Sequence, residues 1–257
     1  MLTMHQHLEK QFKKSFMTTA FISDLHLSAQ RPDITLRFQH FIENDLNDIE
    51  TLYILGDLFE YWIGDDATDV LGLREIINAL KQLSDSGIKG FFISGNRDFL
   101  IGEQFSHETG FSILPDETVI ELGGRQVVIL HGDSLCTDDV IHQQFRKEMM
   151  CNPEFHQYAL SMPIPERIET AKKLRGMSAE HKSEISEEIM DVNENAVVQL
   201  FEQKGVTQMI HGHTHRPNIH LHTTSQGEAE RIVLGDWYSQ SSFLTYDGAG
   251  FRLSNLA

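Results

Sequence analysis

Five short apolar runs in this chain each lead directly into Asp, Asn or His, and this repeated arrangement constrains the fold more than any other feature. A run of four to eight apolar residues is typical of a buried strand, and its end feeds a polar loop. Loops that follow neighbouring strands converge outside the carboxyl ends of an open sheet. The sequence therefore predicts an α/β fold that gathers polar side chains at one edge. The five fragments are ISDLHL, YILGDLFEYWIGDD, FFISGNRDF, VVILHGD and HGHTHRP.

The segments between these fragments predict alternating helices and strands. Residues 20–23, 51–55 and 90–94 are expected strands, and apolar residues recur at helical intervals in residues 37–49 and 70–83. Such alternation favours a largely parallel sheet. Later segments favour antiparallel pairs joined by turns. The later strands are expected at residues 119–122 and 126–130 around Gly123-Gly124, then at 206–210, 220–224, 231–234, 242–247 and 250–253.

Residues 138–204 lack strand signals and carry a helical pattern with breaks at prolines, so we interpret them as an inserted helical lobe. The sheet completes after this lobe, which makes residues 17–257 one domain, preceded by an extension at residues 1–16. The long apolar side chains of the lobe either form its own core or line a slot for a flexible apolar ligand. They are Phe145, Met149, Met150, Phe155, Tyr158, Leu160, Met162, Ile164 and Ile168.

The composition limits the kind of partner. Lys and Arg number 21 and Asp and Glu number 38, and a net charge of −17 argues against nonspecific nucleic-acid binding through a broad basic surface. An anionic substrate remains possible, because bound divalent ions reverse the local potential. The two cysteines, Cys136 and Cys151, are too few for a disulfide framework. No apolar stretch approaches the ~20 residues that span a bilayer, so we expect a cytoplasmic protein, soluble or peripherally attached to a membrane.

The polar residues at the strand ends are of the types that bind transition metals. Asp24 and His26 are two residues apart, so a strand end would direct both to one side. A mixture of carboxylate, amide and imidazole ligands suits Mn²⁺, Fe²⁺ or Zn²⁺. Asp57 is the predicted bridge, because one carboxylate can hold two ions ~3.5–4 Å apart. Any one fragment alone is equally consistent with a capping Asp or a core His. The seven predicted ligands are Asp24, His26, Asp57, Asn96, His131, His213 and His215.

The fragments DLH, GD, GNRD, HGD and GHTH resemble the calcineurin-like metallophosphoesterase superfamily in their order and residues. The resemblance implies a sandwich of two mixed sheets flanked by helices. It also implies two metal ions that share Asp57. Asp24, His26 and His215 would complete one site, and Asn96, His131 and His213 would complete the other. His211 lies outside the matched G-H-x-H, and we interpret it as structural.

Two ions would lower the pKa of a bridging water and neutralise charge on the phosphoryl oxygens, so no side-chain nucleophile is required. Asn96 and Arg97 are the expected catalytic residues beside the ions. Arg97 can donate a forked pair of hydrogen bonds to phosphate. An ion pair between Arg97 and Asp98 or another carboxylate is the alternative.

Longer fragments, among them GDLFEYWIGDD and HGDSLCTDD, resemble the UDP-2,3-diacylglucosamine hydrolases of lipid A biosynthesis. This resemblance implies attack of water at the α-phosphorus, giving UMP and 2,3-diacylglucosamine 1-phosphate. It further implies two Mn²⁺ ions. The lipid substrate and the apolar lobe together favour a shallow, peripheral contact with the cytoplasmic face of the inner membrane. The implied substrate contacts are Asn96, Arg97, Asp139, Ser178 and His213.

Several assignments remain open at this point. Asp139 is equally consistent with a helix N-terminal carboxylate, and we interpret Asp65 and Asp66 as supporting or capping groups. After Ser178 the family pattern has Asn and Lys where this chain has Lys182 and Ile185, which leaves the lobe contacts in doubt. A phosphoesterase of soluble nucleotides and a non-catalytic scaffold are the alternative functions. The oligomeric state is not predicted.

Overall fold

A computed structural model of the chain describes residues 18–46, 48–184, 186 and 189–256, without the side chains of residues 179 and 182–184. The predicted extension at residues 1–16, with His5 and His7, lies outside the described residues. So do Ile185 and the side chain of Lys182.

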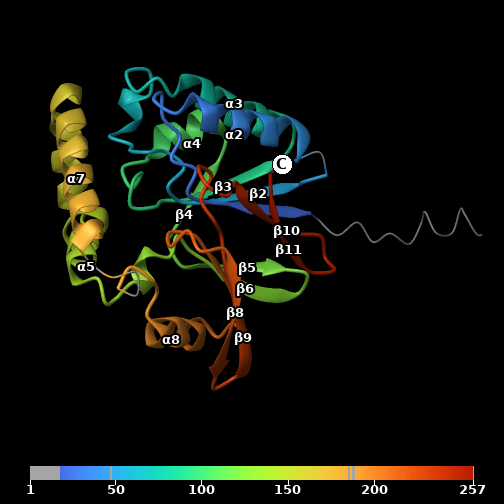
Figure 1. Cartoon of the computed structure of the whole chain (residues 1–257). Helices are drawn as coiled ribbons and strands as arrows, with labels where there is room; N and C mark the ends of the chain where they lie inside the picture. The colour runs from blue at the N-terminus through green and yellow to red at the C-terminus, as the bar shows by residue number, and fades with distance from the viewer. Residues whose placement is uncertain (1–17, 47, 185, 187–188, 257) are drawn as a thin grey trace, which may run out of the picture.

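Two mixed sheets form the centre of the molecule (Figure 1). The first sheet has the order β11-β10-β1-β2-β3-β4, with four parallel strands and an antiparallel pair at one edge. All residues of β1 and β2 are buried, as expected for strands covered on both faces. The strands are β1 (Thr19–Ile22), β2 (Thr51–Leu55), β3 (Lys89–Ile93), β4 (Ser112–Leu114), β10 (Ser242–Tyr246) and β11 (Phe251–Asn255).

The second sheet has the order β5-β6-β7-β9-β8, in which β6, β7 and β9 are parallel and the two edge strands are antiparallel. The hairpin predicted at Gly123-Gly124 is confirmed, with φ of 57° and 82° at the two glycines. The antiparallel pairs predicted near residues 220–234 and 242–253 are also confirmed. The strands are β5 (Thr118–Leu122), β6 (Arg125–Ile129), β7 (Gln208–His211), β8 (Asn218–Thr224) and β9 (Gly227–Val233).

Helices cover the outer faces of both sheets, and apolar side chains fill the space between the sheets. Phe21 and Leu55 of the first sheet pack in one buried cluster with Ile129, Ile210 and Ile232 of the second. The predicted sandwich of two mixed sheets with flanking helices is therefore confirmed. The first sheet is covered by α2 (Pro32–Asn44), α3 (Arg74–Asp85) and α4 (Glu103–Thr109), and the second by α8 (Glu194–Lys204).

The boundaries of α2 correct one expectation. The helix predicted over residues 37–49 begins at Pro32 and ends at Asn44. Proline is favoured in the first helical turn, because its fixed φ suits the helix and its missing N–H has no partner to lose there. The short elements α4 and β4 were not predicted.

The inserted segment divides into two parts. The helices α5 (Val140–Phe145), α6 (Pro153–Ser161) and α7 (Ile164–Glu184), with the π-helical turn η3 (Arg146–Met150), lie beside the sandwich (Figure 1). The segment predicted as a lobe over residues 138–204 also contains α8, which packs on the second sheet through Val197, Leu200 and Phe201. We therefore use the word lobe for α5, η3, α6 and α7 alone.

Polar contacts fix the long helix α7 against the sandwich. Arg167 is buried and donates to the carbonyl oxygen of Ile63 at 2.6 Å and to Asp66 at 2.7 Å. Further along the helix, Arg175 forms an ion pair with Glu60. These contacts hold α7 against the segment that follows β2.

Candidate metal centre

Five of the seven predicted ligands have a left-handed backbone. This conformation is uncommon for residues other than glycine and costs about 1–3 kcal/mol per residue. It turns the chain sharply after a strand, so that side chains two residues apart face one point. Such strain persists only where the surrounding structure holds it, and it concentrates at functional sites. The five residues, with φ between 51° and 65°, are Asp24, His26, Asp57, His213 and His215.

Asp24, His26 and His215 form the first group that can hold an ion, because their ligand atoms lie within 4.8 Å of one another. His215 Nε2 lies 3.1 Å from Asp24 Oδ1. The other oxygen of Asp24 accepts the backbone N–H of His213 at 2.9 Å. The loop after β7 is thereby anchored on the carboxylate that follows β1.

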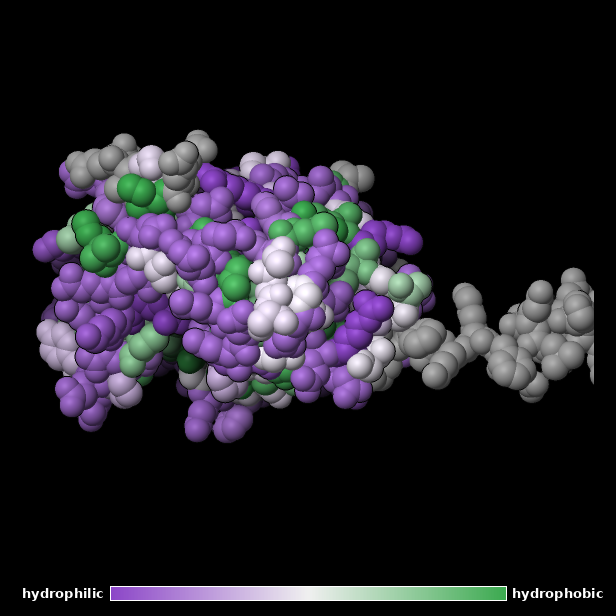
Figure 2. All heavy atoms as spheres, turned by 90° about the horizontal axis from the view of Figure 1, so that it is seen from below, coloured by the Kyte–Doolittle hydropathy of each residue, from purple (hydrophilic) through white to green (hydrophobic). Residues whose placement is uncertain are grey.

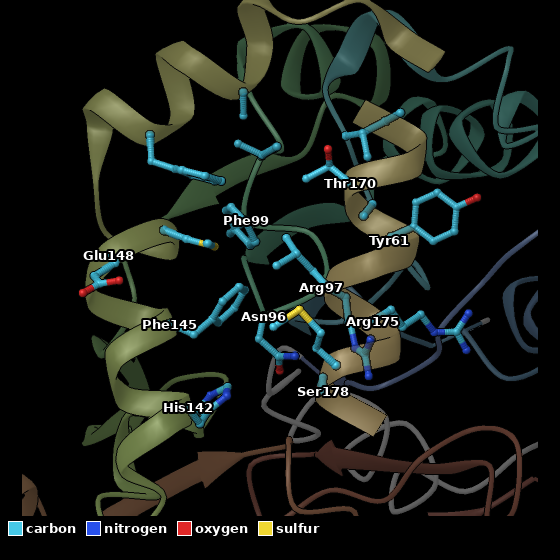
Figure 3. Close-up of a pocket in the computed structure, with 18 of the residues that line it drawn as sticks. Tyr61, Asn96, Arg97, Phe99, His142, Phe145, Glu148, Thr170, Arg175 and Ser178 are labelled. Atoms are coloured by element: carbon cyan, nitrogen blue, oxygen red, sulfur yellow. The ribbon is translucent and has the colours of Figure 1, made fainter. Parts of the chain in front are cut away.

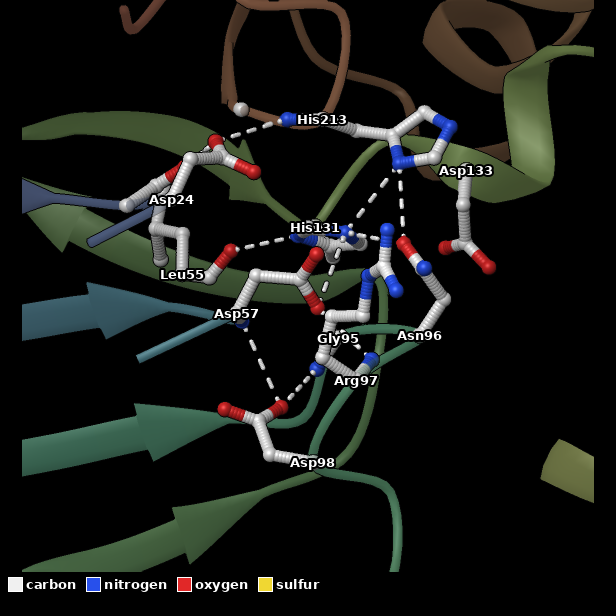
Figure 4. A network of polar contacts seen from close by, with 12 residues as sticks. Asp24, Leu55, Asp57, Gly95, Asn96, Arg97, Asp98, His131, Asp133 and His213 are labelled. Atoms are coloured by element: carbon white, nitrogen blue, oxygen red, sulfur yellow. Dashed lines mark hydrogen bonds and ion pairs between the residues drawn. The ribbon is translucent and has the colours of Figure 1, made fainter. Parts of the chain in front are cut away.

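The second group contains Asp24, Asp57 and His131, again with ligand atoms within 4.8 Å. His131 Nε2 lies 3.1 Å from Asn96 Oδ1 and 3.2 Å from His213 Nδ1 (Figure 4). Its Nδ1 lies 2.8 Å from the carbonyl oxygen of Leu55. An N–H at Nδ1 donates to that carbonyl, which leaves the lone pair of Nε2 directed at the cluster.

Asp57 belongs to the second group and also faces the first. Its Oδ1 is 3.7 Å from His131 Nε2, and its Oδ2 is 3.9 Å from His26 Nε2. One oxygen therefore faces each group, as a bridging carboxylate requires. Asp24 is the residue common to both three-residue groups.

Two glycines of the motifs lie directly against these carboxylates. A Cβ atom at Gly95 would lie 2.3 Å from Asp57 Oδ1, and one at Gly212 would lie 2.3 Å from Asp24 Oδ2. Any other residue would displace a carboxylate. The glycines of GNRD and GHTH are therefore required by close approach to the site.

The electrostatics of the cluster favour a bound cation. Burial raises the pKa of Asp24, but the neighbouring His215 and His131 outweigh burial and hold that pKa well below its usual range. Burial lowers the pKa of His131, yet Asp57, Asp24 and Asp133 outweigh burial and raise it to about 9. Burial lowers the pKa of His26 to about 4 despite two carboxylates nearby. Ionised carboxylates thus surround neutral or protonatable imidazoles.

The donor set fits divalent ions on chemical grounds as well. His26 Nδ1 is buried without a hydrogen-bond partner. Carboxylate oxygens, an amide oxygen and imidazole nitrogens are all present among the clustered atoms, and this mixture suits Mn²⁺, Fe²⁺ or Zn²⁺.

Asp98 has a role that the sequence analysis missed. It is completely buried and accepts backbone N–H groups from Gly95 at 2.7 Å, Leu58 at 2.8 Å and Asp57 at 3.3 Å. Burial and the charge of Asp57 raise its pKa to about 7. Asp98 joins the loops after β2 and β3, rather than pairing with the neighbouring Arg97. Its position as the last residue of GNRD was the signal available.

His211 is buried outside the cluster, consistent with the structural role that we expected. Its Nδ1 lies 2.8 Å from the carbonyl oxygen of Gly212, and its Nε2 lies 3.1 Å from Arg231 Nη1. Both ring nitrogens are therefore engaged by neighbours.

Asp65 supports the start of α4, because its carboxylate accepts the backbone N–H groups of Gly102 and Phe105.

A large apolar cavity of about 590 Å³ opens beside the cluster (Figure 3). Asn96, Arg97 and Ser178 of α7 are among the residues that line it. Arg97 donates its backbone N–H to Asp57 Oδ1 at 2.8 Å, and its side-chain Nε is buried without a partner. The apolar lining includes Trp62, Phe99, Leu100, Phe145, Met149, Phe155, Met162 and Leu174.

The lobe has little core of its own. Among the described residues of α5, α6 and α7, only Ala159 and Arg167 are buried. Phe145, Met149 and Phe155 line the cavity instead. Part of the apolar surface of the lobe therefore faces a space large enough for a ligand, whereas Tyr158 and Leu160 are exposed.

Asp139 has two protein partners as well as a place on the cavity wall. It accepts the backbone N–H of His142 at 2.9 Å as the N-cap of α5, and it lies 2.9 Å from His181 Nε2 of α7. The predicted alternative, a carboxylate at a helix N-terminus, is therefore present. The lobe contacts expected around Lys182 and Ile185 fall outside the described side chains.

The comparisons with known proteins agree with this geometry. Residues 17–217 match the family model of the calcineurin-like phosphoesterases. A protein from Yersinia enterocolitica named UDP-2,3-diacylglucosamine hydrolase is 48% identical over 228 residues, which are 89% of this chain and 94% of that protein. A protein of the same name from Yersinia pestis has the same identity and coverage.

Solved structures with a similar chain path are more distant. An archaeal phosphodiesterase aligns with a TM-score of 0.48 at 13% identity, covering 93% of this chain and all of the other. Vacuolar protein sorting 29 from Cryptosporidium parvum aligns with a TM-score of 0.45 at 10% identity, covering 95% of this chain and all of the other. Both scores are below 0.5, so the assignment of the family depends on the family model and the close relatives.

We predict that Mn²⁺ stabilises the fold through the clustered ligands. At a hundredfold excess over its dissociation constant, a bound ion adds about 2.7 kcal/mol to the free energy of unfolding, which is roughly 5–10 °C in melting temperature. Differential scanning calorimetry with Mn²⁺ and after chelation measures this shift. Asp57→Asn should lose most of it, whereas Asp48→Asn, at an exposed position, should retain it. An unchanged shift in Asp57→Asn would contradict the assignment of this carboxylate.

Proposed function

Because the chain belongs to the calcineurin-like phosphoesterase family, we propose that it is an enzyme that hydrolyses the pyrophosphate of UDP-2,3-diacylglucosamine. The products are UMP and 2,3-diacylglucosamine 1-phosphate. The close relatives are named after this activity, and the match covers 94% of their length.

One observation supports the proposal most directly: the apolar cavity of the lobe adjoins the cluster of predicted metal ligands. Asn96 and Arg97 belong to the wall of that cavity, and Asn96 also contacts His131 and His213. A substrate with acyl chains on one side of its pyrophosphate needs this combination. Cavities of this size and apolar lining are typical of small-molecule sites. A phosphoesterase that acts on soluble nucleotides would not need an apolar cavity, because its substrate has no acyl chains to bury.

We assign the metal ligands as two sets that share Asp57. Asp24, His26 and His215 belong with one ion, and Asn96, His131 and His213 belong with the other. Bound divalent ions would supply Lewis acidity and an activated water at the α-phosphorus. We propose Mn²⁺ for both positions, which the mixed oxygen and imidazole donors accommodate.

The protein's own groups position the substrate. Arg97 can donate a forked pair of hydrogen bonds to the phosphoryl oxygens, since its Nε has no protein partner. Asn96 Oδ1 lies 3.1 Å from both His131 Nε2 and His213 Nδ1, which is close enough for one ion to contact all three atoms. We assign Asp139, Ser178 and His213 to the remaining substrate contacts. The helix α7 supplies one wall of the apolar part, with Leu174 and Met177 among its lining residues.

We further propose a peripheral contact with the cytoplasmic face of the inner membrane, made by the lobe. No helix among the described residues is long and apolar enough to cross a membrane. The face in Figure 2 is largely hydrophilic, with apolar groups in small separate areas. Apolar side chains with large exposed fractions occur on the lobe, namely Val140 (72%), Ile141 (62%), Tyr158 (62%) and Met177 (58%).

Sedimentation with anionic liposomes tests this membrane contact. We expect part of the protein in the pellet, and less for Val140→Ser combined with Tyr158→Ser, because both changes remove exposed apolar area outside the cavity. Complete recovery of the unsubstituted protein in the supernatant would count against the contact.

The decisive test of the proposed function compares substrates that differ only in their acyl chains. With Mn²⁺ present, we expect kcat/KM for UDP-2,3-diacylglucosamine to exceed that for UDP-N-acetylglucosamine by at least about a hundredfold, since burial contributes ~0.8 kcal/mol per CH₂. Release of UMP is measured by chromatography. Equal kcat/KM for the two substrates would contradict a role for the acyl chains and would favour an enzyme that acts on soluble nucleotides.

Two variants serve as controls for this assay. Arg97→Ala should lose at least about tenfold in turnover, because a charge-assisted pair of hydrogen bonds is removed. Its Mn²⁺-dependent rise in melting temperature should remain. Arg252→Ala, at an exposed position of β11, should behave as the unsubstituted protein. A chain with no turnover of either substrate would instead be a non-catalytic scaffold.

A further inference from the structure

A second, polar cavity of about 280 Å³ adjoins the apolar one and is lined by several of the predicted metal ligands. The two cavities share Glu60, Asn96, Arg97 and Arg175 as wall residues. They therefore meet at the position where the phosphoryl group would lie. If the apolar cavity holds the acyl chains, the part of the substrate beyond the α-phosphorus extends into the polar cavity.

Two residues of this polar cavity are neither predicted metal ligands nor part of the apolar wall. They are Arg31, just before α2, and Tyr238, in the loop between β9 and β10. Arg31 also interacts electrostatically with Glu60, one of the wall residues that the two cavities share. The polar cavity thus continues beyond the cluster to a guanidinium and an aromatic ring.

Tyr238 is held in place while part of its ring stays open. Its hydroxyl lies 2.8 Å from His215 Nδ1, and its ring centroid lies 5.7 Å from that of His215 and 5.8 Å from that of His26. The residue is nevertheless 42% exposed. An anchored ring with an accessible surface is suited to stack on a planar group.

Arg31 retains capacity to donate hydrogen bonds. Its Nε and Nη2 donate to the two oxygens of Asp33 at 2.9 Å and 2.8 Å. A guanidinium has five N–H donors in a fixed plane, so three remain for a ligand. Carbonyl and phosphate oxygens are the acceptors that such a group prefers.

We propose that Arg31 and Tyr238 form the nucleoside subsite of this enzyme, with the pyrimidine base stacked on Tyr238 and Arg31 donating to oxygens of the nucleotide. This inference rests on the proposed function, because it takes the ligand to be a uridine nucleotide. It adds the half of the substrate that the apolar cavity leaves unassigned.

Calorimetric titration with UMP at saturating Mn²⁺ tests the subsite. We expect Tyr238→Ala and Arg31→Ala to weaken UMP binding by about tenfold, a typical loss for a base-stacking side chain. Tyr238→Phe keeps the ring and should bind UMP within about twofold of the unsubstituted protein. Because Tyr238→Phe loses the contact with His215, its Mn²⁺ affinity should fall, and saturation with Mn²⁺ removes that effect from the comparison.

Two further probes separate stacking from indirect effects. Ribose 5-phosphate lacks the base, so Tyr238→Ala should not alter its binding. The product 2,3-diacylglucosamine 1-phosphate should bind equally to all variants. Arg252→Ala is the matched control for Arg31→Ala, and melting temperatures verify that each variant is folded.

Specific results would overturn the subsite. Unchanged UMP binding by Tyr238→Ala would exclude stacking, and equal weakening by Tyr238→Phe and Tyr238→Ala would show that Tyr238 acts only through His215. If the unsubstituted protein hydrolyses UDP-2,3-diacylglucosamine while these results hold, the subsite is wrong and the proposed function stands. If it fails to hydrolyse that substrate, the proposed function fails independently of the UMP titration.

Discussion

Asp24 and Asp57 are carboxylates with almost no exposure to water, at 0% and 2%, and the structure around them compensates for their burial. Removing an ionised group from water costs several kcal/mol unless other charges and hydrogen bonds offset the loss. Imidazoles from separate loops lie beside both carboxylates, and the charges of Asp57 and Asp24 raise the pKa of His131 to about 9. Divalent ions would supply the missing positive charge more completely. The left-handed backbone at five ligand positions is the conformational cost of bringing these groups together.

Much of this site could be predicted because its signals are local. Each ligand type directly follows an apolar strand, and the strand ends of a mainly parallel sheet meet at one edge. The Gly123-Gly124 hairpin was equally readable, since both positions need positive φ. The left-handed conformations at Asp24 and Asp57 could not be predicted from the sequence. A residue other than glycine adopts this conformation only where tertiary contacts hold it there.

Other features depend on packing that a sequence pattern does not contain. The helix α8 has the same periodicity as the lobe helices, yet it covers the second sheet. The buried Asp98 looked like a partner for Arg97, but it instead accepts backbone N–H groups from two loops. Arg175 and Tyr238 lie far from the motifs in sequence and reach the site only through the placement of α7 and the loop after β9. Their roles require the folded structure.

The most direct measurement of the central claim is anomalous diffraction from crystals soaked in Mn²⁺. We expect two anomalous peaks ~3.5–4 Å apart, with one oxygen of Asp57 contacting each ion. His26 and His215 should contact one ion, and His131 and His213 the other. A single peak, or two peaks without Asp57 between them, would contradict a pair of metal ions that share Asp57.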